Sequence, residues 1–248
     1  MNYDLVIIGG GISGLYSALK LQKNYNKILL VEKNSNLGGR IQTEKLNYNG
    51  IKVNNGAARF SKTHKLLWKL LEDLNLIGDI QSTSNKVSYY YQDNFINNIK
   101  AIDTWNLILK ALNLFYNEGY KREDLIHFTM KELTDRYLSR KEANWCEVSY
   151  PYSYKYKKCN AAISVNVIKE HYHDNFYTLK GGLHRIVEMI KSQFSNVDVM
   201  LDTECYSITD NILNYLVKVK NDKDINIKCK ELIVALPPNA LDNIKFTD

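Results

Sequence analysis

Three glycines near the N-terminus have the spacing of a phosphate-binding turn. Gly9-x-Gly11-x-x-Gly14 directly follows the apolar run Leu5–Ile8. In such a turn the first glycine permits a tight bend, the second lets a pyrophosphate approach the backbone, and the third lets a helix pack against a strand. Glu32 ends the next apolar run, where a carboxylate can accept hydrogen bonds from an adenosine ribose and disfavours the 2′-phosphate of NADP. The spacing predicts a dinucleotide site.

The residues after the second glycine are expected to open a helix. A helix N-terminus offers unpaired N–H groups and the positive end of a dipole to a phosphate. A glycine-rich turn without a ligand is the alternative, but the strand, the helix and the acid occur here in the right order. The expected cofactor-binding residues of this region are Gly9, Gly11, Ile12, Ser13, Gly14, Glu32 and Lys33.

A glycine pair follows a few residues after Glu32. In Gly38-Gly39-Arg40 the glycines permit close approach of the backbone, and the guanidinium can pair with phosphate oxygens. Taken alone, the tripeptide fits a turn with a surface arginine equally well. Where the tripeptide follows a dinucleotide-binding motif, as it does here, it favours a flavin-containing cofactor over NAD.

The surrounding pattern predicts an α/β fold. Continuous apolar runs at 5–8 and 28–31 read as strands buried on both faces, and an amphipathic helix is expected between them, over 13–23. A second amphipathic helix is expected over 63–74. Strand, helix and strand of these lengths form a βαβ unit with a parallel sheet, as in a Rossmann-like FAD/NAD(P)-binding domain.

The middle of the chain predicts a mainly helical insertion. Strands are expected over 87–91 and 95–99, helices over 104–116, 123–138 and 161–172, and a Tyr- and Lys-rich loop over 150–158. After it the pattern predicts a helix around 183–190 and strands over 197–201, 216–219, 225–229 and 232–236. We expect an FAD-binding domain made of residues 1–80 and 175–248, interrupted by a partial substrate domain, residues 81–174.

Several motifs together resemble the flavin-containing amine oxidase superfamily. They are the segment Asp4–Leu15, the acid Glu32, and Leu37-Gly38-Gly39-Arg40. The segment Asn54–Phe60 resembles the stretch that passes under the flavin ring in that family, which usually has an acidic residue near the position of Asn54. Further resemblances, in chain order, are Tyr177-x-Leu179-x-Gly181-Gly182-Leu183, Leu201–Cys205 and Ile233–Pro238.

The resemblance implies further site residues. Gly56, Ala57, Ala58 and Arg59 would lie against the flavin, and Cys205 would stand in the strand whose backbone faces the adenine. In the amino-acid oxidases of this superfamily, the arginine at the position of Arg59 binds the substrate carboxylate. Arg59 is therefore the candidate substrate-binding residue, with a pairing to a nearby acid or to the cofactor as the alternative. No catalytic base is assigned.

The resemblance implies an FAD-dependent oxidoreductase. It would oxidise an amine or an L-amino acid by hydride transfer to the flavin, with oxygen as acceptor. Family members continue for some two hundred residues beyond the position of Pro238, so we expect a truncated enzyme or one piece of a split flavoenzyme completed by a second chain. The alternatives are a non-catalytic dinucleotide-binding module and an NAD-dependent enzyme, the latter disfavoured by Gly38-Gly39-Arg40.

Composition narrows the class of protein. The 248 residues are 45% hydrophobic and carry a net charge of +6, which favours anionic partners such as a phosphate-bearing cofactor. No apolar run approaches the ~18 residues of a membrane span. Four scattered cysteines, without a Cys-x-x-Cys pair, and an N-terminus without a signal peptide predict a cytoplasmic protein with free thiols.

Two other patterns could bind a ligand, but each has a simpler explanation. His171 and His173 could ligate a metal, but no third ligand is near, so a solvated loop is favoured and no metal is expected. The tyrosines and lysines of 150–158 could stack on and pair with single-stranded nucleic acid. A surface loop is more common for such a patch, and the expected partner is a small amine or amino acid.

Overall fold

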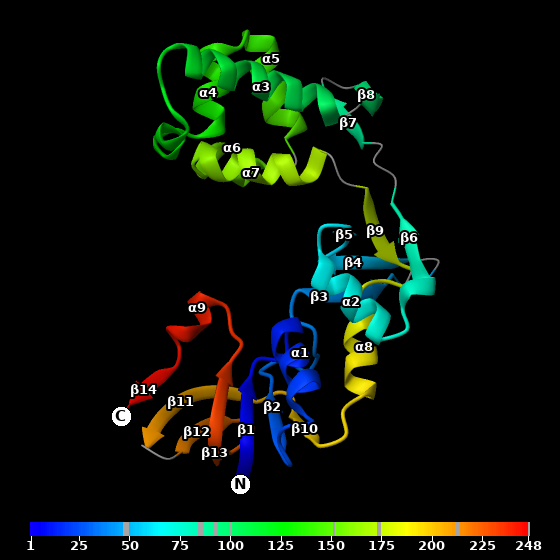
Figure 1. The fold of residues 1–248 in the computed structure, drawn as a ribbon, viewed down its shortest axis with the longest axis vertical. Helices are drawn as coiled ribbons and strands as arrows, with labels where there is room; N and C mark the ends of the chain where they lie inside the picture. Colours follow the sequence, from blue (N-terminus) through cyan, green and yellow to red (C-terminus); the bar gives the residue numbers. More distant parts are fainter. Residues whose placement is uncertain are drawn as a thin grey trace. The chain divides into compact units, whose positions relative to one another are not determined.

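We describe the fold from a computed structural model of the chain. It describes residues 1–46, 50–83, 87–91, 94–99, 101–150, 152–172, 175–211 and 214–247. The chain divides into two compact units (Figure 1). The first, which we call the sheet unit, comprises Met1–Ser82 and Tyr177–Asp248, and the second, the helical unit, comprises Thr83–Phe176.

A seven-stranded sheet organises the sheet unit, in the order β10-β2-β1-β13-β12-β11-β14. Its first four strands pair in parallel, and β11, β12 and β13 form an antiparallel meander. This mixed sheet, with a parallel core, confirms the predicted α/β class. The strands are β1 (Asn2–Ile8), β2 (Ile28–Val31), β10 (Val197–Met200), β11 (Glu204–Asn211), β12 (Asn214–Lys220), β13 (Asp224–Val234) and β14 (Lys245–Thr247).

The central strands are buried on both faces, as their continuous apolar runs predict. Leu5 and Ile7 of β1 face a core shared with the helices α1 (Ile12–Leu21), α2 (Lys65–Asp73) and α8 (His184–Ser192). Val6 and Ile8 alternate to the other face and pack with residues of β11, β12 and β13. Two separate cores therefore fix β1 and the turn that follows it.

The expectation of two strands over 225–229 and 232–236 was wrong. The structure has one strand, β13, whose first half pairs antiparallel with β12 and whose second half pairs parallel with β1. The two apolar stretches are separated by Lys230 and Glu231, and neither of these residues favours a turn. Both side chains extend to the surface, where Lys230 pairs with Asp4 at 2.8 Å. The strand ends at Val234, and Pro237 then caps the short helix α9 (Pro238–Leu241).

Smaller sheets connect the two halves of the sheet unit. β3 (Ile41–Lys45) and β4 (Lys52–Gly56) form an antiparallel pair. β5 (Phe60–Ser61), β9 (Phe176–Leu179) and β6 (Ile80–Ser82) form a three-stranded sheet, with the short 3-10 helix η1 (Ile77–Asp79) before β6. The sequence patterns did not predict these strands, because their side chains do not alternate between apolar and polar.

The helical unit contains an antiparallel strand pair, β7 (Val87–Tyr91) and β8 (Asn94–Ile99), followed by helices packed around a core of their own. The predicted strands are joined by Gln92-Asp93-Asn94, of which Gln92 and Asp93 lie outside the described residues and Asn94 is the first residue of β8. The helices are α3 (Ala101–Asn117), the 3-10 helix η2 (Arg122–His127), α4 (Met130–Tyr137), α5 (Arg140–Ser149), α6 (Ser153–Lys158) and α7 (Ala161–Tyr172).

Two predictions for this unit were wrong. The single helix expected over 123–138 is divided at Thr129, whose hydroxyl accepts a hydrogen bond from Glu132 N while the Glu132 carboxylate accepts one from Thr129 N. This capping box starts a new helix. The loop expected over 150–158 contains α6, because Tyr156 is fully buried and anchors that turn in the core.

The start of α5 predicts a dependence of stability on pH. Hydrogen bonds from Lys110 and from Ser139 lower the pKa of Glu142 from its ordinary value of 4.5 to about 2. A carboxyl whose pKa is lower in the folded state than in the unfolded state stabilises the fold at pH values above its unfolded-state pKa. This stabilisation is lost as the pH falls through the folded-state pKa. Between pH 4.5 and 2, Glu142→Gln should therefore flatten the decline of the urea midpoint. Glu123→Gln in η2, which makes no ion pair with a described residue, should leave the decline unchanged.

Candidate functional site

The glycine turn joins β1 to α1. Gly9 has a φ of 107°, in the left-handed region, and its N–H donates to the carbonyl of Val31 at 2.8 Å. A Cβ on Gly14 would collide with the backbone carbonyl oxygen of Gly9. The helix can therefore approach the strand this closely only because residue 14 has no side chain.

Gly11 leaves open space at the start of α1. A Cβ built on it would meet no atom within 4 Å, and no side chain caps the N-terminus of the helix. The first turn contains no acidic residue, and the side chain of Ser13 is exposed. Uncapped amides, the positive end of the helix dipole and an open approach over Gly11 fit a diphosphate.

Glu32 is buried beside this turn, with 7% of its surface exposed. Its Oε2 accepts a hydrogen bond from Gly10 N at 2.7 Å, and its Oε1 accepts from Asn34 N at 2.9 Å and from Asn34 Nδ2 at 2.7 Å. The carboxylate therefore holds the glycine turn in place, a role that spacing alone did not indicate. The neighbouring Lys33 is exposed.

The glycine pair Gly38-Gly39 lies directly against the turn 9–14. Gly38 N donates to the carbonyl of Gly10 at 2.8 Å, and Gly38 forms a β-bridge with Gly11. A Cβ on Gly39 would lie 3.3 Å from the Cα of Gly11. The glycines allow two backbone segments to meet, and the side chain of Arg40 is exposed next to them.

The segment that ends in Arg59 lies against Arg40. Ala57 N donates to the Arg40 carbonyl at 2.9 Å, and a Cβ on Gly56 would collide with the same oxygen. Ala58 and Arg59 are exposed. The structure thus brings three segments together that are separate in the sequence, the turn 9–14, the pair 38–40 and the stretch 56–59.

Asn54 fixes the position of the last stretch. Its Oδ1 accepts hydrogen bonds from Thr43 Oγ1 at 2.8 Å and from Leu183 N at 3.0 Å. Its Nδ2 lies 3.5 Å from the carbonyl oxygen of Ala58 and from Thr178 Oγ1, and that hydroxyl donates to Ala58 O at 3.0 Å. An amide serves here because it accepts and donates, whereas an ionised carboxylate only accepts.

Cys205 stands in β11 opposite Val219 of β12. Its side chain is buried in the core that β1 shares with β11, β12 and β13, and burial raises the pKa of its thiol to about 11. The thiol therefore faces the core, and only the backbone at this position can face a ligand. The strand starts next to Glu32, because Thr203 N donates to the Glu32 carbonyl at 2.9 Å.

The four free cysteines differ in access, which predicts their reactivity. Cys146, Cys205 and Cys229 are buried, and burial raises the pKa of each thiol to about 11 or 12. Cys159 is partly exposed. At pH 8, one thiol per chain should react rapidly with Ellman's reagent, and Cys159→Ser should abolish that phase. Four thiols should react after denaturation, and a rapid phase that survives the substitution would contradict the burial of the others.

Two other features bear on the kind of site. Within the described ranges, no group of three His, Cys, Asp or Glu side chains could hold a metal ion. His173 is outside those ranges, and the side chain of His171 is not described. No helix in the described part of the chain is long and apolar enough to cross a membrane.

Comparisons with known proteins identify the family. The model of the family described as "Flavin containing amine oxidoreductase" matches residues 12–248. A pseudooxynicotine dehydrogenase from a Pseudomonas species is 23% identical over 100% of this chain and 54% of its own length. An L-amino acid oxidase from Cerastes cerastes is 30% identical over 39% of this chain and 18% of its own.

A solved structure of putrescine oxidase has the same fold. The two chains superpose with a TM-score of 0.75 at 17% identity, and the match covers 100% of this chain and 61% of the putrescine oxidase chain. The chain thus spans little more than half the length of the relatives that match it throughout. From the family match, which extends over most of the sequence, the chain belongs to the flavin-containing amine oxidoreductases, and this membership confirms FAD as the expected cofactor.

Proposed function

We propose that this chain forms the FAD-binding part, and a part of the substrate domain, of an oxidoreductase that oxidises an amine or an L-amino acid. The observation that carries the proposal is that the turn 9–14, with open space over Gly11, contacts the pair 38–40, which in turn contacts the stretch 56–59. The sheet unit is assigned to the cofactor and the helical unit to the substrate side.

Each residue group has a role that follows from its position. The amides at the start of α1 and the space over Gly11 would receive the diphosphate, and Arg40 would add a guanidinium for its oxygens. Glu32 would accept one hydrogen bond from the adenosine ribose on Oε2, because Gly10 N uses one lone pair of that oxygen while Asn34 N and Nδ2 use both lone pairs of Oε1. The backbone of β11 at Cys205 would lie along the adenine.

The chemistry that FAD supplies in such an oxidoreductase is acceptance of a hydride from the carbon next to the substrate nitrogen, with oxygen as final acceptor. The protein's task is to hold the substrate in place and to exclude water. Arg59 is suited to bind a substrate carboxylate, because a planar guanidinium pairs with it in two places. Asn54 would set the position of Arg59 through the carbonyl of Ala58.

The first experiment is the visible absorption spectrum of the purified chain, before and after denaturation. A yellow protein that releases flavin supports the assigned cofactor site. A protein that stays colourless when FAD is added contradicts FAD binding by this chain alone, and would favour a split flavoenzyme or a non-catalytic module.

Activity is tested separately on chain that holds flavin. Oxygen consumption is measured over a panel of amines and L-amino acids. Arg59→Gln should lower kcat/KM for an L-amino acid by about tenfold to hundredfold, the value of a charge-assisted hydrogen bond, and leave kcat/KM for an amine unchanged. A flat response over the whole panel, with flavin bound, would exclude the oxidase reaction.

A further inference from the structure

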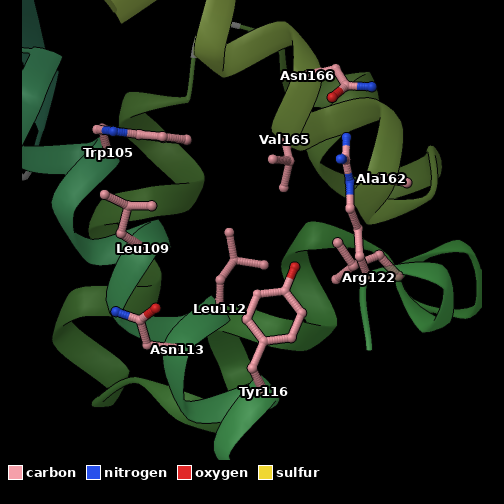
Figure 2. A pocket seen from close by; sticks show the side chains of 10 residues that line it. Trp105, Leu109, Leu112, Asn113, Tyr116, Arg122, Ala162, Val165 and Asn166 are labelled. Carbon is pink, nitrogen blue, oxygen red and sulfur yellow. The ribbon is translucent and has the colours of Figure 1, made fainter. Parts of the chain in front are cut away.

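A pocket of about 170 Å³ lies within the helical unit, between α3, η2 and α7 (Figure 2). All the residues that line it belong to this unit, and none belongs to the three segments assigned to the cofactor. An apolar cavity of about 150 Å³ holds a benzene molecule. The volume is therefore sufficient for one aromatic ring or a short aliphatic chain.

The inner wall of the pocket is apolar. Trp105, Leu112 and Leu125 are buried and line it, and Val165 from α7 faces them. In Figure 2 the side chains of Leu112 and Val165 point into the same space. An apolar body that enters this space gains free energy by leaving water.

The rim is polar and carries a positive charge. Arg122 is the charged residue of the lining, and it makes no ion pair with any residue that the structure describes. Among the acids near it in the sequence, Glu118 pairs with Arg136 at 2.6 Å and Asp124 accepts from Lys121 N at 2.7 Å, while Glu123 makes no ion pair with any described residue. The phenol of Tyr116 is directed toward the cavity as a second donor (Figure 2).

We propose that this pocket binds a small monocarboxylate with an apolar body, such as an arylalkanoate. The ring or chain would occupy the space between Leu112 and Val165. The carboxylate would accept hydrogen bonds from the Arg122 guanidinium and the Tyr116 hydroxyl at the rim. Its lining residues are different from those assigned to the flavin, and the proposal does not depend on the proposed oxidase reaction.

The test compares 3-phenylpropionate with its neutral amide, 3-phenylpropionamide, by titration calorimetry on the whole chain. We expect the acid to bind with a Kd on the order of 1 mM, as its size implies, and the amide to bind at least about tenfold more weakly. Binding of the acid should also change the fluorescence of Trp105, and Trp105→Phe should remove that change. Equal binding of acid and amide, or no binding of the acid at 10-fold the expected Kd, would overturn the proposal.

Matched variants locate the site. Arg122→Gln should weaken binding of the acid about tenfold or more and leave binding of the amide unchanged, whereas Lys121→Gln, next to it but outside the lining, should change neither. Ala162→Leu should fill the pocket and abolish binding of both compounds. Binding that survives Arg122→Gln and Ala162→Leu would place the acid elsewhere, for example at Arg59, and would refute this site.

Discussion

Replacing Gly14 with alanine is expected to lower the free energy of unfolding by about 3 kcal/mol, at the upper end of the cost of an overpacked site. The added methyl would collide with the carbonyl oxygen of Gly9, which is backbone and cannot rotate away as a side chain could. Helix α1 would have to move off β1, and the core contacts of Leu15 and Ala18 would be disturbed. Urea unfolding followed by circular dichroism measures the change.

Gly11→Ala is the matched control, because the same methyl group there meets no atom within 4 Å. Its stability should stay within about 1 kcal/mol of the parent chain. The methyl would nevertheless occupy the approach to the amides of α1, so FAD binding should weaken by about tenfold to hundredfold, as for the loss of a charge-assisted hydrogen bond. If Gly14→Ala is as stable as Gly11→Ala, the close packing of helix and strand at this turn is refuted.

The second large effect is expected at Glu32. Glu32→Ala should lower the free energy of unfolding by about 3 kcal/mol, because Gly10 N loses its acceptor in a buried position and Asn34 loses a charged partner. FAD binding should weaken as well, since the glycine turn would no longer be held. Unfolding and flavin titration are measured on the same variant.

Two variants distinguish this role from a general effect of charge. Glu32→Gln keeps one oxygen that can accept from Gly10 N but turns an NH2 group toward the two Asn34 donors, so its stability should lie between those of the parent chain and Glu32→Ala. Glu44→Ala removes an exposed carboxylate that accepts from Asn55 Nδ2, and should cost no more than about 0.5 kcal/mol. A loss at Glu32→Ala no larger than at Glu44→Ala would show that the carboxylate does not hold the turn.

The parts of the fold that could be predicted are those whose side chains follow a strong pattern. β1 and β2 lie where continuous apolar runs predict strands, because both of their faces are buried. β3 and β4 carry mostly polar, exposed side chains, so no period of two distinguishes them from a loop. The start of α5 does have a local signal in the sequence, because Ser139 and Glu142 have the spacing of a capping box, which the structure forms.

For the candidate site, the sequence indicated the residue types but not their contacts. The spacing of Gly9, Gly11 and Gly14 implies a tight turn through local geometry alone. The bond from Gly38 N to the Gly10 carbonyl, and the bonds of Asn54 to Leu183 and Ala58, join segments far apart in the chain. Contacts of that kind depend on how the small sheets pack, and no period or spacing records them.

The interrupted sheet has a consequence for the order of assembly during synthesis. β1 carries the glycine turn and is synthesised before its neighbour β13, which is complete only after residue 234. The helical unit is one contiguous segment with a buried core of its own, and all of it is synthesised while β1 still has an open edge. The cofactor site therefore acquires its complete sheet only after the whole helical unit has been synthesised, although its glycine turn precedes that unit in the chain.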